Sequence, residues 1–321
     1  MADRQQNLYG LLIKDPRRIF VIAEAGINDG GNKERALALV RAAKWTGADA
    51  VKFRAFKADR LPTRPAVLGH TKDQSSLEEP YKLELTPETF RAVHKESQRL
   101  DIEFIATPFD EESSDFLDEL GVNAFKIAPR DIARRQLIDH VARKRKPVLL
   151  FTGMCSAEQI EKAIGWMRTQ SNDQIVLLHC VSSNPAKVEE LNLKSVQCLH
   201  GRFGLPVGFS DHSASILGSI VATSLGAQVI ERHFTIESRA DATDHMVSMD
   251  AKQLKLHIEE LRTIGTMLGE RSQFALETEN SDNIASRRAL RRPIPPSDTV
   301  SSGTGSKHRL AARASAAAHK K

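Results

Sequence analysis

Short β-rich apolar runs alternate with amphipathic stretches of helical length over most of this chain. Such alternation is typical of parallel strands linked by helices. Eight strand–helix pairs are counted, and eight similar units favour a closed (β/α)₈ TIM barrel, an α/β fold, over an open sheet. The predicted strands are residues 19–25, 50–53, 103–106, 124–127, 147–151, 175–179, 206–209 and 229–231.

Apolar residues recur at spacings of three and four between these strands, which predicts helices with one buried face. A longer polar stretch, residues 59–86, contains three prolines and a glycine and is predicted to be a functional lid. The clearest helical faces are Ala36, Leu39, Val40 and Ala43; Phe116, Leu117 and Leu120; and Leu254, Ile258, Leu261 and Ile264.

The length of 321 residues suits one barrel with appendages, because such barrels take about 250 residues. We predict an N-terminal extension over residues 1–18, the barrel over 19–270, and a linker and tail over 271–321. From Arg291 the chain is rich in Pro, Ser, Gly and Ala without periodicity. This composition predicts a disordered basic tail.

The formal net charge of +5 is concentrated in that tail. Residues 287–321 hold nine Lys and Arg residues against one acidic residue, Asp298. The preceding part is therefore slightly acidic, and we expect no nucleic-acid partner. Neither a signal peptide nor a membrane-spanning stretch is expected. Cys155, Cys180 and Cys198 form no CxxC pair and are predicted to be buried free thiols, so a cytoplasmic location is expected.

Polar residues gather where the predicted strands end, which is where barrels of this type carry their active sites. Lys52 and Lys126 lie inside apolar strands, where an ammonium is costly to bury unless an anion neutralises it. An ion pair with a barrel carboxylate explains one such lysine as well as a ligand does. Two of them favour a phosphate or carboxylate ligand.

His212 and His233 follow adjacent predicted strands, close enough in a barrel to share one metal ion. Imidazole suits Mn, Co, Fe or Zn better than Mg or Ca. Histidines hydrogen-bonded within the core are the alternative. Asp211 would orient His212 or act behind it.

In combination, these segments resemble the N-acetylneuraminate (sialic acid) synthase family. They occur in the family's order between about residues 18 and 270. The segments that carry the resemblance are 22–28 (IAEAGIN), 47–53 (GADAVKF), 106–110 (ATPFD), 125–128 (FKIA), 152–154 (TGM), 178–180 (LHC), 204–212 (GLPVGFSDH), 226–235 (GAQVIERHFT) and 244–245 (DH).

The resemblance implies a synthase that condenses phosphoenolpyruvate with an N-acetylmannosamine-type amino sugar and releases phosphate, within a homodimer. It implies that His212 and His233 hold a divalent metal, Mn²⁺ foremost with Mg²⁺ or Co²⁺ as alternatives. The other implied site residues are Lys52, Lys126, Thr107 and Ser210 for phosphoenolpyruvate, Glu24 and Asp244 for sugar hydroxyls, and Asn28 and Asp131 as further substrate contacts.

The sequence also departs from the family's usual pattern. Pro129 and Phe151 replace small residues that donate to phosphate, whereas Arg54 and Arg130 are additional cations able to restore the anion site by bidentate contact. Further departures are Asp29, Gly30, Ser182 and Asn184.

The C-terminus differs as well. Residues 286–290 resemble the opening of the family's small antifreeze-like second domain, but the rest of the tail does not follow it. Two alternatives therefore stay open beside the active synthase. One is a catalytically weakened relative that binds an anion or sugar, and the other is a phosphoenolpyruvate-dependent synthase with another aldose acceptor.

Overall fold

The structure is a computed structural model that describes residues 8–15, 17–60, 79–237, 244 and 247–269. Several sequence predictions lie outside these residues. They are the tail over 271–321, the resemblance of 286–290 to a second domain, the part of the predicted lid over 61–78, and His245.

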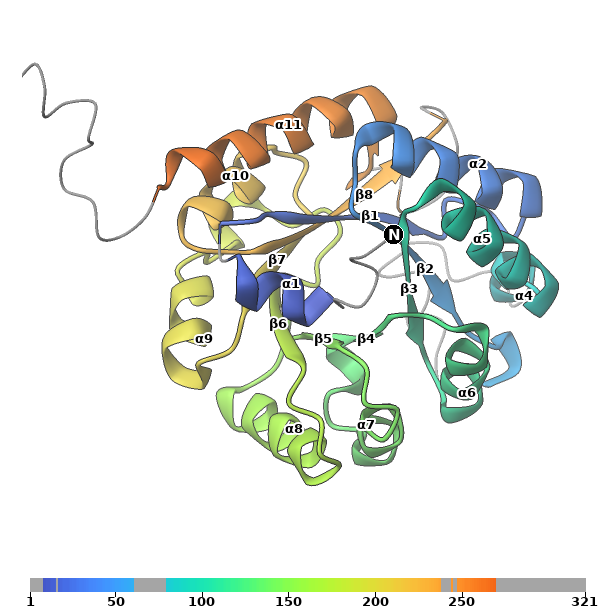
Figure 1. Ribbon diagram of the computed structural model, residues 1–321, viewed down its shortest axis with the longest axis horizontal. Helices are drawn as coiled ribbons and strands as arrows, with labels where there is room; N and C mark the ends of the chain where they lie inside the picture. Colours follow the sequence, from blue (N-terminus) through green and yellow to red (C-terminus); the bar gives the residue numbers. More distant parts are fainter. Residues whose placement is uncertain (1–7, 16, 61–78, 238–243, 245–246, 270–321) are drawn as a thin grey trace, which may run out of the picture. The chain divides into compact units, whose positions relative to one another are not determined.

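Eight strands form a closed barrel in which every neighbouring pair is parallel. The strands follow chain order around the barrel, and β1 closes it by pairing with β8 as well as β2 (Figure 1). A short ninth strand, β9 (Met249–Asp250), pairs in parallel with the end of β8. The barrel strands are β1 (Phe20–Gly26), β2 (Ala50–Ala55), β3 (Glu103–Pro108), β4 (Ala124–Ile127), β5 (Val148–Phe151), β6 (Ile175–Cys180), β7 (Val207–Asp211) and β8 (Val229–Thr235). The predicted (β/α)₈ fold is confirmed.

Helices surround the barrel between successive strands (Figure 1). The predicted apolar faces are confirmed as the contact surfaces, since Leu39, Leu117 and Ile258 are fully buried against the outside of the strands. The helices are α1 (Leu8–Lys14), α2 (Lys33–Thr46), α4 (Glu79–Leu83), α5 (Pro87–Leu100), α6 (Glu111–Leu120), α7 (Arg135–Ala142), α8 (Ala157–Thr169), α9 (Ser195–Phe203), α10 (Leu217–Ser224) and α11 (Ala251–Met267), with 3₁₀ turns η1 (Ala58–Arg60), η2 (Pro129–Asp131) and η3 (Val188–Glu190).

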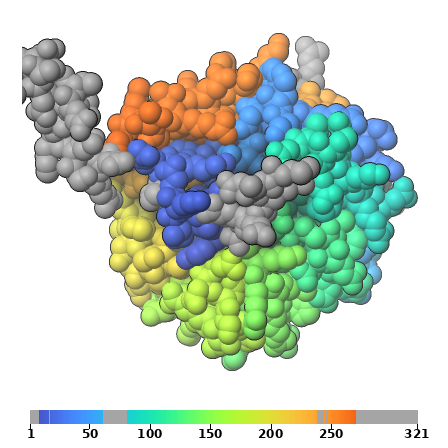
Figure 2. All heavy atoms as spheres, in the orientation of Figure 1, coloured from blue at the N-terminus to red at the C-terminus, as the bar shows by residue number. Residues whose placement is uncertain are grey.

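Helix α1 lies within the predicted N-terminal extension and covers the end of the barrel where the strands begin. Leu8 and Leu12 are buried in the cluster that fills the barrel interior, together with Phe20 and Ile22. Figure 2 shows α1 in blue at the centre of this face. The interior of the barrel at this end is therefore filled with apolar side chains, which leaves the opposite end, where the strands finish, for polar site residues.

Several strands extend further than the sequence predicted. Asp211 and His233 were expected after their strands but lie within β7 and β8. The physical reason is pairing with neighbours: Asp211 stands beside Arg232 in the β7–β8 ladder, and β8 continues along β9. Polar residues at these positions are retained in the strands because the backbone hydrogen bonds are made regardless of side-chain polarity.

The cysteine prediction is partly wrong. Cys180 is buried, but Cys155 is only partly buried and Cys198 is exposed on α9. All three are free thiols. Among the described residues no helix has the length and apolar character needed to cross a membrane.

Candidate active site

The mouth at the carboxyl ends of the strands collects most of the predicted site residues. Strand register places Glu24 beside both Lys52 and His233, and Ser210 beside Glu231. Glu24 and His233 lie on β1 and β8, which are far apart in sequence and adjacent because the barrel closes between them. The structure therefore confirms that the two ends of the chain's barrel segment meet at one site.

Lys52 is fully buried and already has carboxylate partners. Its Nζ lies 3.1 Å from Glu24 Oε2 and donates a short hydrogen bond to Glu231. Glu231 also accepts a hydrogen bond of 2.9 Å from Ser210 Oγ. Although burial opposes charge, the carboxylates of Glu231 and Glu24 raise the pKa of Lys52. For Lys52 the structure therefore shows the ion pair with barrel carboxylates that the sequence left open for one of the two lysines.

Arg54 is likewise bound to acidic side chains. Its Nη2 donates to Asp244 Oδ2 at 3.0 Å, and its Nε lies 3.7 Å from Glu24 Oε1. Asp244 reaches this position because Gly26, at φ +60°, leaves room where any Cβ would collide with the carboxylate. Burial works against ionisation of Asp244, but Arg54 and His233 keep its pKa below the ordinary value. Arg54 is therefore part of an internal network rather than an uncommitted phosphate ligand.

Lys126 differs from Lys52. Its Nζ lies 4.0 Å from the centroid of the Phe151 ring, and the Nζ of Lys52 lies 4.9 Å from the same ring. In the described part of the chain no acidic side chain forms an ion pair with Lys126. Burial and the neighbouring ammonium of Lys52 lower the pKa of Lys126 to about 8. Lys126 is thus the cation in this mouth that remains available for a ligand.

His212 and His233 lie side by side, with ring centroids 5.5 Å apart. The Nδ1 of His212 donates to the carbonyl of Val181 at 2.8 Å, which leaves its Nε2 as an acceptor. His233 Nδ1 is buried without a hydrogen-bond partner and lies 3.7 Å from Asp244 Oδ2. Burial lowers the pKa of His233 to about 3, so the ring is neutral at physiological pH.

Two neutral imidazoles fit a borderline divalent cation. Within the described ranges no group of three or more His, Cys, Asp or Glu is arranged to hold a metal ion. The described part of the chain therefore offers the two histidines as protein ligands, and the remaining positions around a cation would fall to water or substrate.

Buried polar atoms without hydrogen-bond partners outline the rest of the mouth. Such atoms are rare in folded proteins unless a ligand or water completes them. Those near the strand ends are Glu24 Oε2, Asn28 Oδ1, Thr107 Oγ1, Asp131 Oδ2, Ser182 Oγ, Asn184 Oδ1 and His233 Nδ1.

Three predicted substrate residues stand apart from the central network. Asn28 donates through Nδ2 to Phe234 O at 2.8 Å and to Ser248 Oγ, so it ties the β1 loop to the β8 loop. Asp131 is buried and binds Arg134 at 3.2 Å. Arg130 on η2 is exposed.

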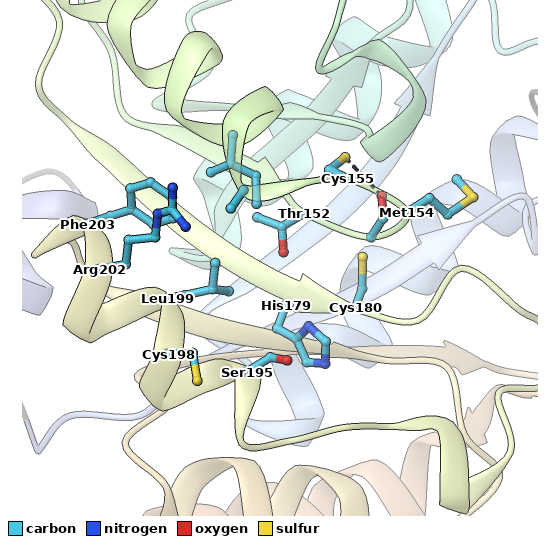
Figure 3. Close-up of a pocket in the computed structure, with 13 residues that line it drawn as sticks. Thr152, Met154, Cys155, His179, Cys180, Ser195, Cys198, Leu199, Arg202 and Phe203 are labelled. Atoms are coloured by element: carbon cyan, nitrogen blue, oxygen red, sulfur yellow. Dashed lines mark hydrogen bonds between the residues drawn. The ribbon is translucent and has the colours of Figure 1, made fainter.

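A cavity of about 380 Å³ lies between α8 and α9, next to the ends of β5 and β6. Figure 3 shows Cys155, Cys180, Cys198 and His179 on its wall. Burial raises the pKa of Cys155 and Cys180 to about 11, so both thiols stay protonated and are poor metal ligands.

Comparison with known proteins identifies the kind of barrel. The model of the NeuB family matches residues 39–273. The chain belongs to the NeuB family. It is 39% identical over 283 residues to N,N'-diacetyllegionaminic acid synthase of Legionella pneumophila, covering 85% of this chain and 78% of that protein.

Two further NeuB relatives extend this result. Pseudaminic acid synthase of Campylobacter jejuni is 31% identical, with 79% of this chain and 76% of that protein covered. The crystal structure of N-acetylneuraminic acid synthetase from Leptospira borgpetersenii in complex with citrate superimposes with a TM-score of 0.78 at 31% identity, covering 87% of this chain and 94% of that one. The resemblance inferred from the sequence is thereby confirmed, and these relatives are named as synthases of nonulosonic acids.

Two groups at the mouth of this NeuB barrel were not among the predicted site residues. Glu231 binds both Lys52 and Ser210, and the phenyl ring of Phe151 contacts both lysines. Sequence could have identified Glu231, because it lies two residues before His233 on β8 and alternate residues of a strand point to the same face. The cation–π contacts carried no such signal, because the sequence marked Phe151 only as a replacement for a small phosphate-donating residue, and its ring meets both lysines only in the folded barrel.

Proposed function

We propose that this chain is a nonulosonate synthase of the N-acetylneuraminate synthase type. It joins phosphoenolpyruvate to the aldehyde carbon of an N-acetylmannosamine-type amino sugar and releases phosphate. The observation that carries the proposal is the mouth of a NeuB-family barrel in which Lys126 faces two neutral histidines across a carboxylate network. The activities for which the relatives are named support the same reaction class. The cytoplasmic location and the homodimer expected from the sequence stay predictions.

Lys126 and Thr107 are the groups proposed to bind the phosphoenolpyruvate anion. Lys126 has no ion-pair partner in the described part of the chain, and Thr107 Oγ1 is buried without a hydrogen bond. Ser210 already donates to Glu231, so it would contact the ligand through its remaining lone pairs. Lys52 is paired with Glu24 and Glu231, so it adds positive potential to the site without binding the ligand directly.

His212 and His233 would hold the divalent cation, for which Mn²⁺ is proposed, with Mg²⁺ or Co²⁺ as alternatives. A cation bound there polarises the sugar aldehyde as a Lewis acid. Glu24 and Asp244 lie beside His233 and accept hydrogen bonds, so they are placed to orient sugar hydroxyls. Arg54 holds both carboxylates in position for this role.

Formal charges in the mouth support joint binding of anion and cation. Three cations, of which Lys52 is buried and the other two partly buried, are matched by three buried carboxylates, so an incoming phosphoenolpyruvate adds uncompensated negative charge that a divalent cation offsets. The two should therefore raise each other's affinity. The cations are Lys52, Arg54 and Lys126, and the anions are Glu24, Glu231 and Asp244.

A second acceptor class is favoured by Arg130. This exposed arginine follows β4, while the neighbouring Asp131 is bound by Arg134 instead. A cation beside the mouth favours an aldose that carries an anionic group such as a phosphate.

The test is phosphate release from phosphoenolpyruvate across a panel of aldoses, with Mn²⁺ and with a chelator. The panel contains mono- and di-N-acetylated amino sugars, their phosphorylated forms and unmodified aldoses. Mn²⁺-dependent release with an N-acetylated amino sugar supports the proposal, and preference for a phosphorylated aldose supports the second acceptor class. Absence of release with every sugar would leave the binding-only alternative.

A further inference from the structure

Lys126 is placed differently from every other group in the barrel mouth. Its amine lies against the face of a buried aromatic ring, 4.0 Å from the Phe151 centroid. Lys52, whose Nζ lies 4.9 Å from the centroid of the same ring, is held by Glu24 and Glu231. Within the described residues Lys126 has no such carboxylate. An apolar wall and an adjacent fixed ammonium are the two conditions that make a lysine amine nucleophilic.

Access and register supply the rest of a covalent site. Lys126 is partly exposed, so a small molecule reaches it from the mouth. The ladder that pairs Ile105 with Ala124 brings Thr107, two residues further along β3, beside Lys126 on the same inward face. The hydroxyl of Thr107 is buried and unpartnered, and it can hydrogen-bond a carboxylate next to the amine.

We propose that Lys126 forms a Schiff base with small 2-keto acids. Its neutral Nζ attacks the ketone carbon and forms a carbon–nitrogen bond, and the ketone oxygen leaves as water after taking up two protons. The product is an imine and one water molecule, and the step needs neither oxidant nor reductant. Thr107 would receive the keto acid's carboxylate, and the Phe151 ring excludes water from the amine.

The electrostatics of the site support this chemistry. The carboxylates that raise the pKa of Lys52 keep it charged, and that charge together with burial lowers the pKa of Lys126 to about 8. Roughly a tenth of Lys126 is then the free amine at pH 7, against less than a thousandth for an ordinary lysine. Imine formation should therefore increase as pH rises toward 8.

The identity of the natural ligand rests on the proposed function, whereas the covalent chemistry does not. That reaction leaves a 2-keto acid in this mouth, so its ketone would meet Lys126 and the product would be retained as an imine. Pyruvate has the same keto-acid group and tests the site without phosphoenolpyruvate or sugar. Failure of the synthase assay would thus leave the pyruvate experiment unaffected.

The experiment is incubation of the full chain with pyruvate, reduction by borohydride, and intact-mass analysis followed by peptide mapping. A single trapped pyruvate on Lys126 is expected, absent from Lys126→Arg. Lys146→Arg is the matched control, because Lys146 also faces a ring, that of Phe125 at 5.8 Å, but is paired with Asp118 at 2.6 Å. This control should keep the adduct.

Phe151→Leu removes the aromatic ring but keeps an apolar side chain beside Lys126. If the apolar surroundings are what matter, this variant should retain most of the adduct. Peptide mapping of the unmodified chain localises the adduct even if Lys126→Arg fails to fold. The proposal is overturned if no adduct forms at high pyruvate concentration, if the adduct persists in folded Lys126→Arg, or if it spreads over surface lysines to the same extent as Lys126.

Discussion

Arg232 and Asp211 form a buried ion pair, with Nη1 and Oδ2 2.7 Å apart, directly behind the two site histidines. The pair joins β7 to β8 on the side that faces the helices, where Ser219 of α10 also donates to Asp211 at 2.7 Å. Each member precedes one histidine in the chain, His212 or His233. The pair therefore determines how the backbone presents both imidazoles to the mouth.

Replacing Asp211 with Asn removes the charge partner of Arg232 while preserving shape. Loss of one partner of a buried pair costs about 3–5 kcal/mol, so the melting temperature should fall. Mn²⁺ affinity should also fall, by about 10–100-fold, as for other groups that support metal ligands. Thermal denaturation and titration calorimetry measure the two effects. Arg99→Gln, which breaks only an exposed pair with Glu96, is the control and should change stability by less than about 1 kcal/mol. Unchanged Mn²⁺ affinity in D211N would limit the pair to a stabilising role.

Substituting His212 or His233 with Ala should abolish Mn²⁺ binding, since each removes half of the imidazole ligands in the described site. Electron paramagnetic resonance of free Mn²⁺ measures binding independently of turnover. His140→Ala is the control, because that histidine binds Asp115 on the outer helices. If both site variants bind Mn²⁺ as tightly as the unchanged chain, the metal assignment is wrong.

Lys52→Met should mainly lower the stability of the fold, whereas Lys126→Met should mainly lower the affinity for phosphoenolpyruvate. The first leaves Glu24 and Glu231 buried without their shared cation and should destabilise the fold by about 3–5 kcal/mol. The second removes a lysine that has no ion pair among the described residues, so stability should stay within about 1 kcal/mol. Phosphoenolpyruvate affinity should fall by about 10-fold or more in Lys126→Met, the size expected for a hydrogen bond to a charged group. Denaturant titration and calorimetry decide between these outcomes, and equal stability losses would contradict the different environments assigned to the two lysines.

Glu231 gives the stability a defined dependence on acid. Burial alone would raise its pKa, but Lys52 and Lys126 lower it to about 2. A carboxyl whose pKa is lower in the folded than in the unfolded chain stabilises the fold above the unfolded value of about 4.5, and that contribution is lost as pH falls toward 2. Over this window the unchanged chain should lose a few kcal/mol more than Glu231→Gln. Melting temperatures measured from pH 5 to the lowest pH at which both proteins stay folded give the difference, and parallel curves would exclude this role for Glu231.

Local pattern in the sequence was sufficient for the barrel and for most of its mouth. Alternation of strand and helix predicts the fold because each strand must bury both faces and each helix one. Lys52, Thr107, Lys126 and Ser210 were found without a structure because they are polar residues in or directly after the predicted strands, near the carboxyl ends where such barrels carry their sites, and the family resemblance implied their role. Their predicted position at the carboxyl ends of strands is where the structure has them.

Partners across the barrel were decided only by the tertiary structure. Glu231 neutralises Lys52 from a distance of 179 residues along the chain, and no local pattern encodes which carboxylate meets which ammonium once the barrel closes. The same closure sets Arg54 on Asp244, 190 residues away, and leaves Lys126 against the ring of Phe151. Side-chain type and strand period are local properties that a sequence displays, whereas the neutralisation of a buried charge depends on distance in space, which only the folded barrel specifies.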